Sequence, residues 1–568
     1  MTLADEYFGY VEKFCKSHGP KTIVLIQVGS FYEVYGILCA NGTYKGALLK
    51  EFASINDMVI APKNMCIGKE DIFMAGFGLQ QLDKYVKRLL EHGYTVPVFV
   101  QDIQGKNTTR SLACIYSPGT YFNNNDIIDI NEDNKNVNNG LSNNSIAIWV
   151  HLSNNLSLNK TPLLTIGLSI IDILTGKWIN YEYTHPYIDS PSVYDELEKY
   201  ISIYLPSECI IITNNIHDYD GKFIDILIKY ANIHADKFHK IYLNDGGTEP
   251  YNNEFVEIAY NYEKQKYQEA LIDKIFGVGS YLEKSEFRDY SFANQSLCFL
   301  LDFIYKHNPS LVKDIDYPVF ENHSNKLVLA NHSLKQLNII SDQRYNGKLS
   351  CVANLLNNCI TNGGKRKFNY ELLHPINDIE ILNKSYKVIE DLLNNEFYKI
   401  IRNDLHDVRD LEKIERKLVL KTINPKDFSI LYANLSNIKK LFKKIIDNKE
   451  NIEFYKYIKY YINYDIFEYC TTIMNFIEDH FDLNKSAFIV MEKWSCYDLN
   501  KLDFINVKYN KDLNNLFKNS IDSREQLNAI SQFLSNIISD YERPKNSTKN
   551  TTKNKKTNIN KDDETYYV

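Results

Sequence analysis

Three features are missing from this sequence: paired cysteines, long apolar runs and an excess of basic residues. The ten cysteines include no Cys-x-x-Cys pair, and the closest two are Cys351 and Cys359. This spacing predicts reduced, mostly buried thiols, with no zinc site and no disulfide framework. No apolar run reaches membrane-spanning length, and the N-terminus carries Asp5 and Glu6 without an Arg-rich amphipathic face. We therefore expect a soluble intracellular protein without a signal peptide, transit peptide or membrane partner.

A nucleotide-binding loop of the Walker A type is also missing. That loop needs G-x-x-x-x-G-K followed by Ser or Thr, because its amides hold phosphates and its hydroxyl holds Mg²⁺. The stretch GGKRK (363–367) has Cys359 at the first glycine position and Arg366 at the hydroxyl position. The other Gly-Lys pairs are followed by Glu, Asn, Trp, Phe or Leu. We expect no catalytic residues, no metal site and no cofactor on this chain, and interpret GGKRK as the start of a helix.

The composition is that of an ordinary globular protein, with 44% hydrophobic and 24% charged residues. A net charge of -7 excludes a uniformly basic nucleic-acid-binding surface. It still allows a local basic channel, which is enough to attract phosphates. At 568 residues the chain is too long for one hydrophobic core, so roughly three or four domains are expected.

Periodicity predicts a multidomain protein that is α/β at first and mostly α afterwards. Residues 1–122 alternate strands and helices, including helices over 4–18 and 80–93, and predict a compact α/β domain. Residues 123–143 are polar low-complexity sequence and predict a linker. Residues 144–280 show three successive strands and then an α/β return, which resembles an RNase H-like sheet. The remainder is helical in period over 281–440 and 441–540, followed by a Lys/Asn-rich tail over 541–568 that we expect to be disordered.

The stretch IVLIQVGSFYEVYG (23–36) places an aromatic and an acidic residue just after a glycine. Period-two alternation puts Phe31 and Glu33 on one side of an extended chain and Tyr32 on the other. Taken alone, the pair predicts a core phenylalanine and a solvated glutamate. Alternatively, an aromatic wedge can enter the minor groove and unstack a base step whose pairing is already damaged. The carboxylate could accept a hydrogen bond from the displaced base, and its unpaired charge would disfavour intact duplex.

The same stretch resembles the mismatch-recognition motif of the MutS family, in which a G-D-F-Y-E run presents a Phe-x-Glu pair to the mispaired base. Gly29, Phe31, Tyr32 and Glu33 match this run. Ser30 stands where Asp is usual, and Gln27 where a basic residue is often found.

The resemblance continues in order along the chain. IFMAGFGLQQ resembles the family's Met-Ala-Gly segment, with Gly78 in place of the usual proline, and TTRSLACIYSPGT resembles the closing strand of the first domain. LSIIDILTGKW resembles strands of the connector domain, and 327–440 resembles the helical core. The matching positions are Met74, Ala75, Gly76, Tyr85, Gln101, Arg110, Ser117, Thr120, Gly363 or Gly364, Arg366, Leu373, Pro375, Asp410, Leu411, Glu412, Arg416 and Pro425.

The resemblance implies a mismatch-recognition domain, a non-catalytic connector, a core and lever domain of long helices, and the start of a clamp. It assigns Phe31 and Glu33 to the mismatch and makes Lys84, Arg88 and Arg110 candidates for contacts with the DNA backbone. The implied partners are duplex DNA with mispairs or small loops and a second subunit, in a homo- or heterodimer. The implied location is the compartment where DNA is replicated, cytoplasm or nucleus. The family's ATPase is not recognisable here, so ATP and Mg²⁺ are expected only if a separate polypeptide supplies them.

Three other interpretations remain open. The chain could be a scaffold subunit of a split or heteromeric complex, without intrinsic mismatch selectivity. It could be a truncated, non-functional remnant. The connector could also be an active nuclease with Asp172 as a metal ligand, although two-metal hydrolysis requires several converging carboxylates.

Overall fold

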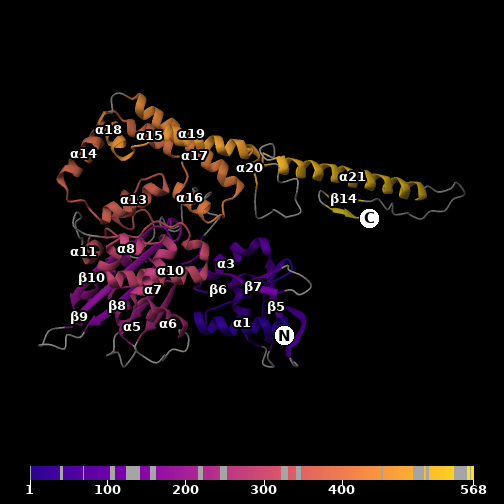
Figure 1. Cartoon of the computed structure of the whole chain (residues 1–568), viewed down its shortest axis with the longest axis horizontal. Coiled ribbons are helices and arrows are strands. Elements are labelled where there is room, and N and C mark those ends of the chain that lie inside the picture. Colours follow the sequence, from indigo (N-terminus) through magenta and orange to yellow (C-terminus); the bar gives the residue numbers. More distant parts are fainter. Residues whose placement is uncertain are drawn as a thin grey trace. The chain divides into compact units, whose positions relative to one another are not determined.

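The computed structural model forms two compact units, Met1–Thr422 and Ile423–Val568 (Figure 1). Within the described residues, no helix combines the length and the apolar character that crossing a membrane requires. Most of the predicted linker and most of the predicted tail lie outside the described residues. The structure describes residues 2–38, 43–67, 70–102, 109–122, 141–153, 162–214, 222–243, 253–321, 331–340, 347–448, 452–489, 504–506, 511–542, 560–562 and 565–567.

A seven-stranded sheet with helices on both faces forms the N-terminal part of the first unit. Its strand order is β4-β5-β2-β1-β6-β7, with β3 beside β2. Strands β1 and β6 are parallel, and the other neighbours are antiparallel. The elements are α1 (Leu3–His18), β1 (Leu25–Val28), β2 (Phe31–Leu38), β3 (Tyr44–Lys45), α2 (Leu49–Ile55), β4 (Ala61–Ile67), β5 (Glu70–Gly78), η1 (Leu79–Gln81), α3 (Leu82–Glu91), β6 (Val96–Asp102) and β7 (Thr109–Tyr116). The α/β character of this region and both of its predicted helices are confirmed.

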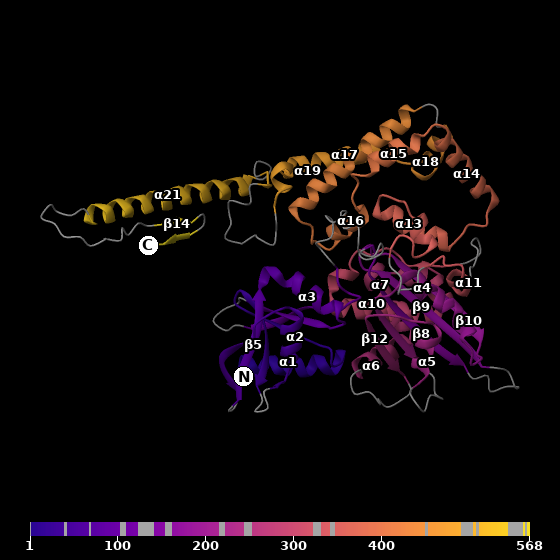
Figure 2. The same ribbon diagram turned by 180° about the vertical axis from the view of Figure 1, so that it is seen from behind.

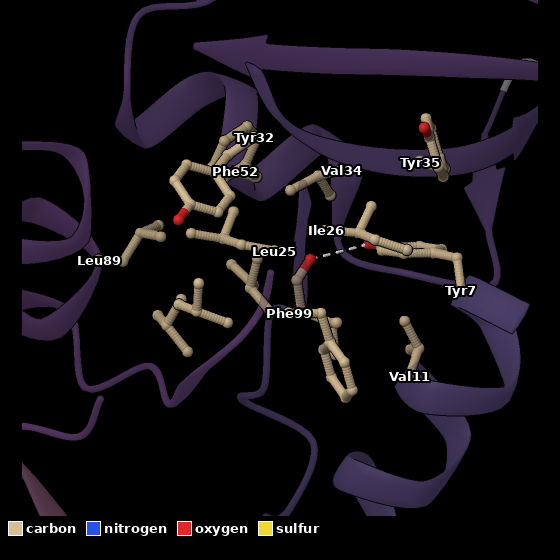
Figure 3. Close-up of a cluster of buried hydrophobic side chains, with 14 of the residues drawn as sticks. Tyr7, Val11, Leu25, Ile26, Tyr32, Val34, Tyr35, Phe52, Leu89 and Phe99 are labelled. Carbon is tan, nitrogen blue, oxygen red and sulfur yellow. Dashed lines mark hydrogen bonds between the residues drawn. The ribbon is translucent and has the colours of Figure 1, made fainter. Parts of the chain in front are cut away.

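The core of this domain is built by side chains that alternate between the two faces of β2. Tyr35 packs edge-on against Tyr7 of α1, with ring centroids 5.0 Å apart. Tyr32 turns to the other face, where Figure 3 shows it beside Phe52 of α2 and Leu89 of α3. The hydroxyl of Tyr7 donates to the carbonyl of Val24. This packing fixes β2 from both sides.

A second, six-stranded sheet has the order β12-β11-β8-β9-β10-β13. Strands β8, β9 and β10 are antiparallel neighbours, whereas β11 and β12 run parallel to β8. The elements are β8 (Asn144–Ser153), β9 (Leu163–Asp172), β10 (Trp178–Pro186), η2 (Pro191–Tyr194), α4 (Asp195–Tyr204), β11 (Glu208–Thr213), α5 (Phe223–Tyr230), β12 (Lys237–Tyr242) and β13 (Val319–Phe320).

Both faces of the second sheet are covered by helices, as Figure 2 shows from behind. Ile146 and Ile148 face α4 and α5, whereas Ala147 and Trp149 face α6, α7 and α10. Helix α10 lies beyond the predicted boundary at residue 280, yet its side chains share one hydrophobic core with the sheet. The covering helices are α6 (Asn253–Tyr262), α7 (Gln265–Phe276), α8 (Ser280–Glu283), α9 (Glu286–Asp289) and α10 (Ser291–His307), followed by η3 (Pro309–Val312).

Helices make up nearly all of the described chain after β13, in agreement with the prediction. In the first unit they are α11 (Asn331–Gln336), α12 (Val352–Leu356), α13 (Asn362–Leu373), α14 (Ile379–Asn394), α15 (Phe397–Leu405) and α16 (Leu411–Val419). The second unit contains α17 (Pro425–Asp447), α18 (Ile452–Tyr461), α19 (Ile466–His480), α20 (Leu483–Ser486) and α21 (Lys511–Glu542), with two short strands, β14 (Asn560–Asp562) and β15 (Thr565–Tyr567). Leu435 of α17 packs against Ile466 and Cys470 of α19.

Candidate nucleic-acid interface

A tight turn connects β1 to β2 and carries the predicted wedge. Val28 pairs with Phe31, so Gly29 and Ser30 alone form the turn. Gly29 has a φ of 59°, a left-handed value that favours glycine. Phe31 is therefore the first residue of strand β2.

Two glutamines and an arginine hold this turn in place. The amide of Gly29 donates to Gln101 Oε1, and Gln27 Nε2 donates to the carbonyl of Gly29, both at 3.0 Å. Gln27 Oε1 in turn accepts from the amide of Gln101 at 3.0 Å. Arg110 Nε donates to the carbonyl of Gln27 at 2.9 Å. The turn is thus rigid because its polar groups are satisfied from β1, β6 and β7.

Phe31 is exposed over 52% of its surface at the tip of this hairpin. Its partner across the sheet is Gly78 of β5. In the described part of the chain, no heavy atom lies within 4 Å of a Cβ built on Gly78, so the space at Gly78 is open. A large aromatic side chain left uncovered on a rigid turn can enter another molecule without rearrangement of the domain. The prediction of a core phenylalanine is wrong.

Glu33, in contrast, is only 5% exposed. Lys63 Nζ of β4 lies 2.8 Å from both carboxylate oxygens of Glu33, and the hydroxyl of Tyr35 donates to Oε2 at 2.5 Å. The expectation of a solvated glutamate is therefore wrong. The expectation that the carboxylate of Glu33 carries an unpaired charge is also wrong, because Lys63 already binds it. Sequence reasoning missed Lys63 and Tyr35. Alternation along β2 could have revealed Tyr35, which shares the face of Glu33.

Burial shapes the chemistry of Tyr35. Desolvation raises the pKa of this phenol, and the hydrogen bond and negative charge of Glu33 raise it further. Tyr35 consequently remains a proton donor to the carboxylate. The other motif residues have packing roles: Tyr32 contacts Phe77 on the opposite face, and Met74 pairs with Tyr35 across β2 and β5.

The three basic residues predicted to contact the DNA backbone differ in environment. Lys84 is exposed on α3, with its ammonium 5.3 Å from the ring centroid of Tyr85. Arg88 forms an ion pair with Asp57, with Nη1 and Oδ2 3.2 Å apart. The side chain of Arg110 is only 9% exposed and supports the turn from inside the domain. We therefore withdraw Arg110 as a phosphate contact.

The short helix η1, which leads into α3, contacts the turn that carries the wedge. The amide of Leu79, in the short helix η1 that leads into α3, donates to the carbonyl of Ser30 at 3.1 Å. Lys84 therefore lies shortly after this segment in the sequence. Its position is compatible with a phosphate contact beside the inserted ring.

Asp172, the candidate nuclease residue, stabilises a turn at the end of β9. Its carboxylate accepts hydrogen bonds from the amides of Asn143 and Leu174 and from the hydroxyl of Thr175, at 2.9, 3.1 and 2.8 Å. Burial raises the pKa of Asp172, and these hydrogen bonds partly offset the rise. In the ranges that the structure describes, no group of three or more His, Cys, Asp or Glu side chains is arranged to hold a metal. The surroundings of Asp172 give the nuclease interpretation no support.

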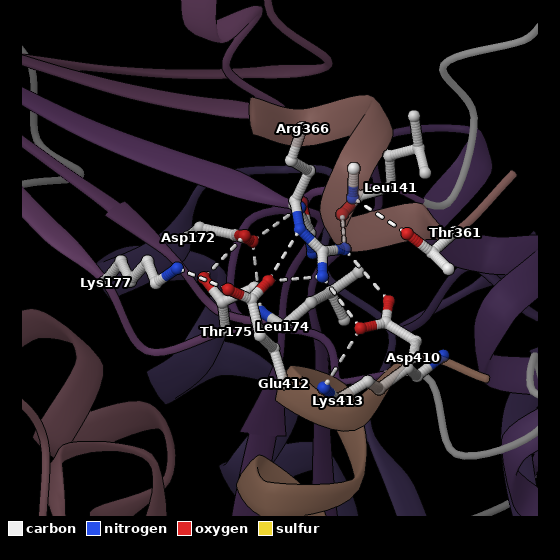
Figure 4. Close-up of polar contacts among 12 residues, drawn as sticks. Leu141, Asp172, Leu174, Thr175, Lys177, Thr361, Arg366, Asp410, Glu412 and Lys413 are labelled. Atoms are coloured by element: carbon white, nitrogen blue, oxygen red, sulfur yellow. Dashed lines mark hydrogen bonds and ion pairs between the residues drawn. The ribbon is translucent and has the colours of Figure 1, made fainter. Parts of the chain in front are cut away.

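The GGKRK stretch begins helix α13, so its interpretation as a helix start is confirmed. Arg366 binds both carboxylate oxygens of Asp410, at 2.7 and 2.9 Å, and its Nε donates to Glu412 at 2.9 Å (Figure 4). It also donates to the carbonyl of Leu141 at 3.0 Å. Burial alone would lower the pKa of Arg366, but the two carboxylates outweigh it and raise the pKa. Arg366 therefore connects α13 and α16 to the start of the second sheet.

Two family models match this chain. MutS domain I matches residues 10–125, and MutS domain III matches residues 332–550. Together they span more than half of the sequence. The first match contains the whole hairpin with Phe31 and Glu33, together with Lys63.

Curated mismatch repair proteins are similar over most of this chain. A putative mutS homologue of Acanthamoeba polyphaga mimivirus is 29% identical over 469 residues, covering 79% of this chain and 40% of the relative. A mitochondrial mutS homologue of Sarcophyton glaucum is 24% identical and covers 78% and 46%. The DNA mismatch repair protein MutS of Caldanaerobacter subterraneus is 24% identical and covers 77% and 43%. The chain thus spans less than half the length of these relatives.

Both matches agree with the fold, in which an α/β domain at the N-terminus is followed by a mostly helical remainder. The chain belongs to the MutS family.

Proposed function

We propose that this chain is the DNA-engaging part of a MutS-type mismatch sensor. Phe31 enters the minor groove at a mispair or small loop, and Glu33 accepts a hydrogen bond from the displaced base. The observation that carries this proposal is the exposed ring of Phe31 on a turn that Gln27 and Gln101 hold rigid. Unstacking a base step costs a few kcal/mol, and the cost is lowest where pairing is already damaged. The wedge therefore selects deformable sites and not a particular sequence.

The remaining domains take the roles that the family provides. We assign the second sheet to an RNase H-like connector without catalytic function, a proposal supported by three antiparallel strands flanked by two parallel ones. The helices after it, from 281 to 440, are assigned to the core and lever, and those from 441 to 540 to the lever and the start of the clamp.

The proposed partners are duplex DNA with mispairs or small loops and a second MutS-type subunit, identical or different. The 568 residues contain no Walker A sequence. We therefore propose that this chain does not hydrolyse ATP, and that ATP and Mg²⁺ act on a part of the assembly outside these residues, such as a separate ATPase polypeptide.

Equilibrium binding to matched duplexes tests this function. The purified chain is titrated with a homoduplex, a G·T duplex and a duplex with one unpaired T, at several salt concentrations. We expect tighter binding to the two damaged duplexes, by about tenfold, which corresponds to about 1.4 kcal/mol. The Phe31→Ala variant should lose this difference, because it lacks the ring that exploits the weakened step.

A second exposed aromatic provides the control. Tyr260 of α6 is exposed over 39% of its surface and lies on a helix that covers the second sheet. The Tyr260→Ala variant should retain the preference. Equal affinity of the unaltered chain for all three duplexes would refute the proposed function.

One observation favours the scaffold function as a second candidate. The carboxylate of Glu33 is already bound by Lys63 and Tyr35, so it is not displayed to solvent. If the ion pair between Lys63 and Glu33 never opened, Glu33 could not bind a displaced base. The chain would then keep its fold without selecting mispaired DNA. Capture of a nucleotide-binding subunit by a chain that shows no heteroduplex preference would support the scaffold.

A further inference from the structure

The ion pair between Lys63 and Glu33 crosses the sheet beside the wedge. Lys63 lies on the edge strand β4, opposite Ile72 of β5, whereas Glu33 lies on β2, opposite Gly76 of β5. The lysine side chain therefore passes over β5 to reach the carboxylate. Its ammonium also lies 5.8 Å from the ring centroid of Tyr35. The pair joins two strands that are not neighbours in the sheet.

The two partners differ in their access to solvent. Glu33 is nearly buried, whereas the side chain of Lys63 is 23% exposed. The ammonium can therefore move toward another anion, while the carboxylate stays beside the wedge. In the closed pair the two charges cancel, so the hairpin approaches phosphates without an unpaired negative charge.

We propose that Lys63 is a specificity-determining residue that exchanges partners during recognition. On intact duplex, Lys63 remains bound to Glu33. At a mispair, a hydrogen-bond donor of the displaced base takes its place on the carboxylate, and the released ammonium binds a phosphate. This inference rests on the proposed function and adds to it the step that distinguishes the two kinds of duplex.

Partner exchange has a signature that a purely structural ion pair lacks. Each phosphate neutralised by a protein cation releases counterions, which adds about 0.9 to the slope of log affinity against log salt. If Lys63 reaches a phosphate only at a lesion, heteroduplex binding has the steeper slope, by about one such contact. A permanent Lys63–Glu33 pair would give both duplexes the same slope.

The test measures both slopes for the full chain and four variants, using a G·T duplex and its homoduplex. The unaltered chain should show a slope difference of about 0.9. Lys63→Met should abolish the difference by making the heteroduplex slope shallower. Glu33→Gln should also abolish the slope difference, but by making the homoduplex slope steeper. Without the Glu33 carboxylate, Lys63 is free to bind a phosphate on both duplexes. Lys63→Arg should retain the difference.

A second lysine of the same domain provides a matched control. Lys45 of β3 forms an exposed ion pair with Glu70, with Nζ and Oε1 2.7 Å apart. Lys45→Met should leave the slope difference unchanged. Thermal unfolding of every variant distinguishes loss of the fold from loss of partner exchange. If Lys63→Met does not fold, the homoduplex slope of Glu33→Gln still tests the proposal.

The outcomes separate the two proposals. Heteroduplex preference with equal slopes in the unaltered chain would overturn partner exchange and leave the proposed function intact. A slope difference that persists in Lys63→Met would do the same. Absence of any preference in the unaltered chain would overturn the proposed function and, with it, this inference.

Discussion

At the scale of the residue, the site depends on how closely β5 approaches the Phe-x-Glu pair. Two glycines of β5 face the two functional side chains: Gly76 lies opposite Glu33, and Gly78 opposite Phe31. A Cβ on Gly76 would lie 2.5 Å from the carbonyl oxygen of Tyr32 and 3.3 Å from Cγ of Glu33. Gly76 thus provides the room in which the carboxylate meets Lys63, whereas Gly78 borders open space.

Alanine substitutions at these two glycines should differ in their effect on stability. Gly76→Ala forces the backbone of β2 to shift, and we expect the free energy of unfolding to fall by about 1–3 kcal/mol. Gly78 has φ -67° and ψ 148°, which alanine adopts freely, so Gly78→Ala should be neutral or stabilising by up to about 1 kcal/mol. Urea denaturation measures both changes. Equal destabilisation by the two variants would show that the close approach at Gly76 is unimportant.

At the scale of the element, the loop after β7 joins the first sheet to the second. Glu208, the first residue of β11, accepts hydrogen bonds from the hydroxyl of Ser117 at 2.5 Å and from the amide of Gly119 at 3.1 Å. His239 of β12 lies 2.6 Å from the other oxygen of Glu208. Burial opposes the charge of Glu208, but His239 and nearby cations outweigh it and lower the pKa to about 2. The Ser-Pro-Gly-Thr segment that the family resemblance identified therefore has a structural role, because Ser117 and Gly119 bind Glu208 of the second sheet.

Histidine burial around this contact should make the fold sensitive to mild acid. His307 of α10 is buried beside His18, its Nε2 has no hydrogen-bond partner among the described residues, and desolvation lowers its pKa to about 4. The unfolded chain therefore binds more protons than the folded one between pH 6.5 and 4. Stability should be complete above about pH 6.5 and decline toward pH 4, with a loss of about 3 kcal/mol from His307.

Unfolding free energies measured from pH 7 to pH 5 test this sign. His307→Gln removes one titrating group and should flatten the decline. Glu208 remains ionised throughout this range, because its pKa lies near 2. An identical slope in the variant would show that His307 does not contribute.

At the scale of the whole molecule, local periodicity was enough to predict the α/β beginning and the helical remainder. Helix α1 and helix α3 follow apolar spacing that the sequence shows directly. The partner of Glu33 could not be predicted, because Lys63 reaches it only through the register of three strands. Arg110 was predicted to contact the DNA backbone because it is basic. The sequence does not show that its side chain is buried beneath a turn. Side-chain pairing across a sheet is a property of register, which one sequence does not reveal.

The central claim is that the ring of Phe31 unstacks a weakened base step. A fluorescent adenine analogue, 2-aminopurine, placed beside a G·T mispair reports this event directly, because its emission rises when stacking is lost. At saturating protein, the unaltered chain should raise emission on the mispaired duplex but not on the homoduplex, and Phe31→Ala should raise neither. An equal rise with Phe31→Ala, or no rise with the unaltered chain, would contradict the account.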